Sequence, residues 1–159
     1  MTNLSFALDS MTRDIRTGHH FYCDTAPVSG EPTVPNESLT RDCVNGDTLF
    51  SFVEGGTSLT GGLSSNRITY YVQDGTIYRK LGGAADPNAD RMTSGDPSIT
   101  ELEFSVVGSE GALFDAVGSD AIQPTATIFV SGLAGDSGRP EEQAVFNMQT
   151  TVTQRRLDL

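Results

Sequence analysis

The stretch LSFALDSMTRDIRTGHHFYC, residues 4–23, decides how the rest of the chain is interpreted. Its apolar side chains recur at spacings of four, three and four residues: Leu4, Leu8, Met11 and Ile15. This spacing places them on one face of a helix, and Gly18 is a typical residue just past a helix end. We therefore predict an amphipathic helix over residues 4–17. Such a helix is marginal alone in water, so its apolar stripe must pack against another element.

The sequence after residue 47 favours β-structure. The segment RITYYVQDGTIYRKL, residues 67–81, has two alternating halves that meet at Asp74-Gly75, and this dipeptide suits the positive φ angles of a type I′ hairpin turn. Further strands are expected at Thr48–Val53, Ile99–Gly108, Thr125–Leu133 and Gln143–Arg155. The alternation predicts that Leu102, Phe104 and Val106 point inward. In the last strand it predicts that Phe146, Met148 and Val152 share one face.

Polar segments rich in Gly, Pro, Ser and Asp separate these elements, which predicts loops at residues 24–47, 82–98, 108–124 and 134–142. The length of 159 residues fits one domain, residues 1–159. We divide it into helix 4–17, a disulfide loop 23–43 and a β-region 48–155. The predicted class is α+β, with the N-terminal amphipathic helix packed on an antiparallel β-sheet.

Charge and hydropathy exclude several functions. The net charge is −11 and Lys80 is the one lysine, so binding to nucleic acid or to anionic lipid is not expected. No apolar run approaches the roughly 18 residues of a membrane span, and the first residues do not resemble a secretory signal.

Two cysteines, Cys23 and Cys43, flank a polar loop that contains proline, without a CxxC motif or a histidine at zinc-finger spacing. This arrangement predicts a disulfide formed in an oxidising compartment. The alternative is two unpaired thiols. A bridge closing a loop of this length stabilises a fold by about 3 kcal/mol in the chain-entropy description.

Four segments together resemble the type IV pilin-like proteins, and most closely the minor pilins and the minor pseudopilins of type II secretion: LDSMTRDIRTG, ITYYVQDGTIYRKL, ITELEFSVVG and FNMQTTVTQRRLDL. The resemblance implies a helix whose hydrophobic first half anchors the subunit in the inner membrane and later forms the filament core. It also implies a leader that is cleaved, with methylation of the new N-terminus. Neither the hydrophobic helix half nor the leader is present before Leu4, and we expect that the sequence starts within the helix.

The resemblance therefore implies a structural subunit that acts by packing against other pilin or pseudopilin subunits, in a periplasmic or extracellular filament. Met11 and Ile15 are expected to pack the helix on the sheet. No enzymatic activity and no cofactor are expected. The alternative from another class is an extracellular adhesive or carbohydrate-binding β-domain, with its loops as the recognition surface.

The candidate chemical sites are weak. Asp86, Asn88 and Asp90 alternate as at the start of a calcium loop, but Arg91 replaces the glycine and Pro97 the final glutamate. His19 and His20 are adjacent, a poor spacing for one metal ion, and are read as a polar helix exit. Catalysis by Cys23 with these histidines is incompatible with a disulfide. Glu101 and Glu103 as a glycosidase pair lack a tryptophan to stack a sugar, and a solvated sheet face is the simpler reading.

Overall fold

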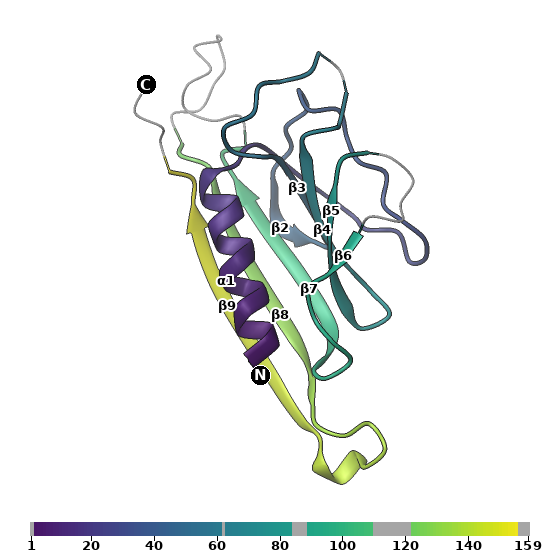
Figure 1. Ribbon diagram of the computed structural model, residues 1–159. Helices are drawn as coiled ribbons and strands as arrows, with labels where there is room; N and C mark the ends of the chain where they lie inside the picture. Colours follow the sequence, from purple (N-terminus) through teal and green to yellow (C-terminus); the bar gives the residue numbers. More distant parts are fainter. Residues whose placement is uncertain (1, 62, 84–88, 110–121, 156–159) are drawn as a thin grey trace.

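The computed structural model describes residues 2–61, 63–83, 89–109 and 122–155. One helix and two antiparallel sheets make up the described chain (Figure 1). The helix α1 spans Thr2–Thr17 and precedes all strands. The first sheet has the order β1-β3-β4-β5-β6, with strands at His19–Asp24, Leu49–Val53, Arg67–Gln73, Thr76–Leu81 and Ala89–Arg91.

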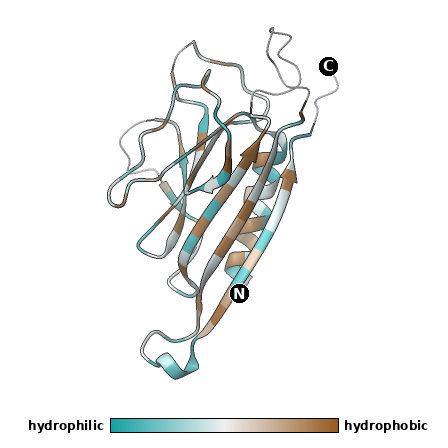
Figure 2. Ribbon diagram, turned by 180° about the vertical axis from the view of Figure 1, so that it is seen from behind, coloured by the Kyte–Doolittle hydropathy of each residue, from teal (hydrophilic) through white to brown (hydrophobic). Residues whose placement is uncertain are grey.

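The second sheet has the order β2-β7-β8-β9. Its strands are Cys43–Asp47, Ser98–Val107, Thr125–Ala134 and Ala144–Thr153, and a short 3-10 helix, η1, spans Pro140–Glu142 before β9. Three of these strands are ten residues long. These three strands form a long platform, and α1 lies on one of its faces. The helix is in front of the platform in Figure 1 and behind it in Figure 2, which shows the molecule from the opposite side.

The predicted α+β class, with one helix on one sheet, is wrong. The described chain is predominantly β and its strands divide into two sheets. Three strands lie where the helix exit and two loops were expected: β1, β2 and β6. They are short or irregular in sequence, and β1 and β2 pair with strands distant in the chain, β3 and β7. Local periodicity cannot reveal such pairing.

The predicted helix is present, and its stripe is buried. Leu4, Leu8, Met11 and Ile15 are joined there by Ala7, which the prediction did not include. Gly18 closes the helix by donating its N–H to the carbonyls of Asp14 and Ile15. A side chain at Gly18 would meet the Phe52 ring, because an added Cβ would lie 2.3 Å from it. Close packing therefore explains the glycine there.

The expected hairpin and the alternation in the strand β7 are confirmed. Gln73 pairs with Thr76 across the turn, and Asp74 and Gly75 have φ angles of 48° and 72°, as a type I′ turn requires. On β7 the inward residues Leu102, Phe104 and Val106 are buried.

Both sheets and the helix share one hydrophobic core. Phenylalanine rings connect the two sheets at its centre. The ring of Phe50 on β3 lies 5.4 Å from that of Phe104 on β7, and 5.2 Å from that of Phe21 on β1. The contact between Phe50 and Phe104 is thus part of the packing of one sheet on the other.

Candidate functional site

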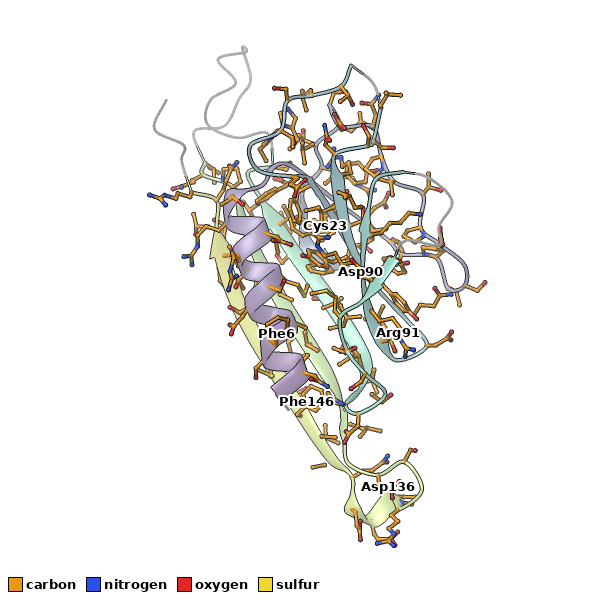
Figure 3. The ribbon with its side chains drawn as sticks, viewed as in Figure 1. Phe6, Cys23, Asp90, Arg91, Asp136 and Phe146 are labelled. Atoms are coloured by element: carbon orange, nitrogen blue, oxygen red, sulfur yellow. A yellow bond between two sulfur atoms is a disulfide. The ribbon has the colours of Figure 1, made fainter. Side chains whose placement is uncertain are left out.

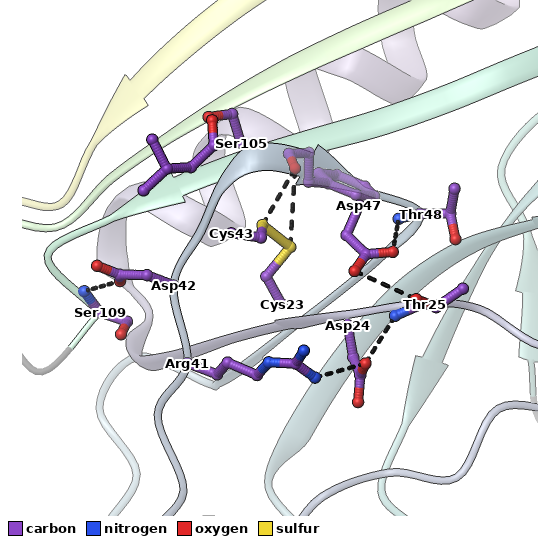
Figure 4. The surroundings of a disulfide bond; sticks show 12 residues. Cys23, Asp24, Thr25, Arg41, Asp42, Cys43, Asp47, Thr48, Ser105 and Ser109 are labelled. Carbon is purple, nitrogen blue, oxygen red and sulfur yellow. Dashed lines mark hydrogen bonds and ion pairs between the residues drawn. A yellow bond between two sulfur atoms is a disulfide. The ribbon is translucent and has the colours of Figure 1, made fainter.

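The predicted disulfide is present and joins the two sheets. Cys23 lies on β1 of the first sheet and Cys43 on β2 of the second, with their Cα atoms 5.8 Å apart (Figure 4). The Phe104 carbonyl oxygen lies 3.7 and 3.1 Å from the two sulfur atoms. A disulfide sulfur carries no hydrogen, so these are packing contacts. The bond links the ends of the residue 24–42 loop to the core.

Polar contacts surround this bond (Figure 4). Arg41 Nη1 lies 2.6 Å from Asp24 Oδ1. Asp42 accepts the N–H of Ser109 at 2.8 Å, which connects the loop to the end of β7. With Cys23 bonded to Cys43, catalysis by a free Cys23 thiol is excluded, because no thiolate is available.

A fully buried carboxylate, Glu37, organises the loop further along. Its oxygens accept the N–H and hydroxyl of Thr60, at 2.7 and 2.9 Å, and the N–H of Asn66 at 2.8 Å. Burial raises the pKa of such a carboxyl, but these donors outweigh burial, so the pKa of Glu37 lies below its usual value. Glu37 thus holds the loop to the segment that connects β3 and β4.

Arg67, at the start of β4, is also fully buried. Its guanidinium donates to the carbonyls of His20 and Asn36, at 2.6 and 2.9 Å, and to that of Glu37 at 3.3 Å. Burial lowers the pKa of Arg67 to about 10, against the opposing effect of the Glu37 charge. Among the described residues, carbonyl dipoles rather than a direct ion pair surround this cation, and its Nε has no hydrogen-bond partner there. Nothing in the local sequence distinguished Glu37 or Arg67 from solvated charges.

His19 and His20 lie on β1, where their Nδ1 atoms are 2.7 Å apart. Burial, the His19 ring and Arg67 lower the pKa of His20 to about 4, and burial lowers that of His19. His20 has a φ of 53°, which turns the chain as it leaves the helix. This pair is thus half-buried, and its lowered pKa values favour the neutral imidazoles.

The helix is fixed by polar contacts as well as by its stripe. Asp14 Oδ2 accepts the Tyr70 hydroxyl at 2.8 Å and Arg79 Nε at 3.1 Å. Burial and the nearby carboxylate raise the pKa of Tyr70, which keeps its hydroxyl a donor. These contacts connect α1 to the first sheet, while Met11 and Ile15 are fully buried, as expected.

The opposite face of α1 carries an exposed aromatic ring. Phe6 is 73% exposed and projects from the helix in Figure 3. A groove of about 300 Å³ runs between α1 and β9. Its helix wall includes Ser5, Asp9, Thr12 and Arg16, and its strand wall is residues 148–152. The helix therefore has aromatic, polar and charged side chains on its surface beside the edge of the second sheet.

Of the three calcium candidates, only Asp90 lies within the described residues. Asp86 and Asn88 lie outside the described ranges. Asp90 lies on the short strand β6 (Figure 3). In the β5–β6 ladder its backbone is opposite that of Arg79. Within the described ranges, no group of three or more His, Cys, Asp or Glu side chains is arranged to hold a metal ion. Glu101 and Glu103 lie on β7.

No helix in the described part of the chain is long and apolar enough to cross a membrane. Comparison of the chain with family models, with curated proteins and with solved structures found no significant match.

Proposed function

We propose that this chain is a structural subunit of a type IV pilus or of a type II secretion pseudopilus, of the minor pilin or minor pseudopilin kind. It acts by packing against other pilin or pseudopilin subunits. The observation that carries the proposal is the docking of α1: its apolar stripe is buried against antiparallel strands, while Phe6 is 73% exposed on the outward face. An exposed aromatic ring on a helix is a common anchor for another protein.

Two further features support a packing role. The disulfide between the sheets suits a protein that works in an oxidising compartment. The buried charges, Glu37 and Arg67, bond to main-chain groups of the loops around them and therefore act in folding. We place the subunit in a periplasmic or extracellular filament, with a full-length precursor anchored in the inner membrane through the preceding helix half.

Site-specific photocrosslinking in the source cell tests the proposal. We expect a photoreactive phenylalanine analogue at Phe6 to crosslink to other filament subunits. The same analogue at Val44, which is 65% exposed on β2, is the matched control for a solvent-facing apolar position. Failure of the Phe6 analogue to capture any filament subunit, together with normal filaments and secretion in cells that lack the chain, would refute the proposal.

An extracellular adhesive or carbohydrate-binding β-domain is the second candidate. The division of the described strands into two antiparallel sheets favours it, because such β-domains present recognition loops between strands. The coding sequence before residue 1 discriminates the two. A basic leader followed by about 20 apolar residues supports the filament subunit, and a conventional signal peptide supports the adhesive domain.

A further inference from the structure

The strand β9 forms an open edge of the second sheet. It is the last strand in the order β2-β7-β8-β9, and all ten of its residues pair with β8 without a register shift. In the described part of the chain, no segment pairs with its other side. Figure 1 shows β9 along the outer margin of the platform. About 33 Å of strand backbone is therefore available for pairing.

The sequence of β9 carries none of the usual protections against pairing. Folded proteins guard sheet edges with charged side chains, proline, bulges or short strands. The strand AVFNMQTTVT contains no charge, no proline and no glycine. Its side chains are mostly of the kind that favours β-structure.

The other three sheet edges are protected. β1 has an irregular register with β3 and is covered on its outer side, where the Cys23 N–H bonds to the Arg41 carbonyl and the Arg41 N–H to that of Phe21. β6 has three residues, of which Asp90 and Arg91 are charged. β2 has five residues and an irregular register with β7. The open edge of β9 is thus the exception in this fold.

We infer that the outer edge of β9 binds the β9 edge of a second copy of this chain, antiparallel, so that two copies share one continuous eight-stranded sheet. This inference does not depend on the proposed filament role. A chain of net charge −11 repels a second copy over much of its surface. The uncharged β9 edge is a place where two copies approach without opposing like charges on the paired strands.

The side-chain pattern of β9 is compatible with itself. Even-numbered residues face the α1 side, where Val152 is buried and Phe146, Met148 and Thr150 are half-buried, and odd-numbered residues face outward. In an antiparallel register centred on Met148 or on Gln149, nine residues of one β9 pair with nine residues of the other. Side chains on the α1 side of one copy then lie beside side chains on the α1 side of the other copy. Neither register opposes two charges. The interface uses the same patch twice, so it closes at a dimer.

The groove between α1 and β9 supports the same geometry. It runs along residues 148–152 of β9, where an added strand would place its α1-facing side chains. The helix wall there carries one acidic residue, Asp9, and one basic residue, Arg16. The wall is therefore neither purely negative nor purely positive. Uncharged threonine and methionine side chains from a second β9 fit this mixed lining.

Sedimentation velocity on the disulfide-bonded chain over a range of concentrations tests the inference. We expect a reversible monomer–dimer equilibrium. The double variant Asn147→Lys/Gln149→Lys is expected to weaken it at least about tenfold, because both registers then oppose lysines. Both residues are exposed, so the variant keeps its fold, as circular dichroism would verify. Thr100→Lys, which adds one lysine at an exposed position of β7 instead of two on β9, is the control and leaves the equilibrium unchanged.

Amide hydrogen exchange provides a second measurement that needs no variant. Protection of β9 amides should rise with protein concentration, whereas that of β6 amides should not. The inference is overturned if the chain stays monomeric up to about 1 mM, if Thr100→Lys weakens the dimer as much as the β9 double variant does, or if β9 protection is independent of concentration. None of these outcomes decides the filament proposal, which the Phe6 crosslink tests separately.

Discussion

Cys23 of β1 and Cys43 of β2 form a covalent bond between the two sheets of this protein, with their Cα atoms 5.8 Å apart. The two residues are 20 positions apart in the chain, but they belong to different sheets, which also contact each other through the shared core and through main-chain hydrogen bonds such as that from Ile99 to Gly75. The bond therefore constrains both the residue 24–42 loop and the packing of one sheet on the other.

Replacing both cysteines with alanine should lower the free energy of unfolding by about 3 kcal/mol, because the unfolded chain regains the entropy of the open loop. Urea denaturation followed by circular dichroism measures this loss. Val44→Ala, at an exposed neighbouring position, should change stability by less than about 0.5 kcal/mol. A loss below about 1 kcal/mol in the double variant would show that the loop is held chiefly by its hydrogen bonds.

Truncating the helix stripe should be far more costly than truncating its outer face. Ile15→Ala should lower the free energy of unfolding by about 2–5 kcal/mol, since the side chain is fully buried in the core. Phe6→Ala should cost less than about 0.5 kcal/mol, because that ring is exposed. Equal losses at the two positions would contradict the observed docking of α1. Thermal and urea unfolding of both variants provide the comparison.

The hydroxyl of Tyr70 should be energetically coupled to Asp14. Tyr70→Phe removes an O–H donor to a carboxylate and should cost about 1.5–3 kcal/mol. In a double-mutant cycle, Tyr70→Phe and Asp14→Asn should be non-additive, since the first removes the donor and the second removes the charge of the acceptor in the same bond. The matched cycle with Asp9→Asn, on the exposed face of the same helix, should be additive. Coupling to Asp9 as strong as to Asp14 would refute the assignment.

Glu37→Gln should destabilise the loop that this carboxylate organises. The carboxylate accepts three hydrogen bonds, whereas the amide has one oxygen and would direct an NH₂ group toward a donor. We expect a loss of about 1–3 kcal/mol, and faster amide exchange at Thr60 and Asn66. The exposed Glu101→Gln is the control, with an expected change below about 0.5 kcal/mol. Unchanged exchange at both amides would be evidence against this role.

Stability should fall on acidification before most carboxylates titrate. The pKa of His20 is about 4 in the folded chain, against 6.5 ordinarily, and that of His19 is also lowered. The unfolded chain therefore binds protons first as the pH decreases. The histidine contribution is complete above pH 6.5 and is lost progressively between pH 6.5 and about 4.

The lowered pKa of Glu37 adds a further loss below its ordinary value of 4.5. Unfolding free energies measured from pH 7.5 down to 4 should show the histidine slope. His20→Asn should reduce it, because asparagine tolerates the positive φ at this position and does not titrate. A slope that is the same in the variant would exclude His20 as its source.

Much of the local structure could be predicted from the sequence. The stripe from Leu4 to Ile15, the Asp74-Gly75 turn and the alternation in β7 each reflect a backbone repeat or turn geometry that neighbouring residues encode. The pairing of Cys23 with Cys43 followed from their being the two cysteines in the chain. The charged groups of the interior could not be predicted, because Glu37 and Arg67 look like ordinary solvated charges until distant loops enclose them.

The sequence by itself thus determined the helix, the main strands and the cysteine pairing, because these depend on short-range geometry or on composition. Only the tertiary structure decided that the strands form two sheets, that β1, β2 and β6 exist, and that β9 is left at an open edge. Strand partners such as β1 with β3 and β2 with β7 are chosen by burial of a shared core around Phe50 and Phe104. That choice depends on contacts between residues far apart in the chain, which local hydrophobic patterns do not specify.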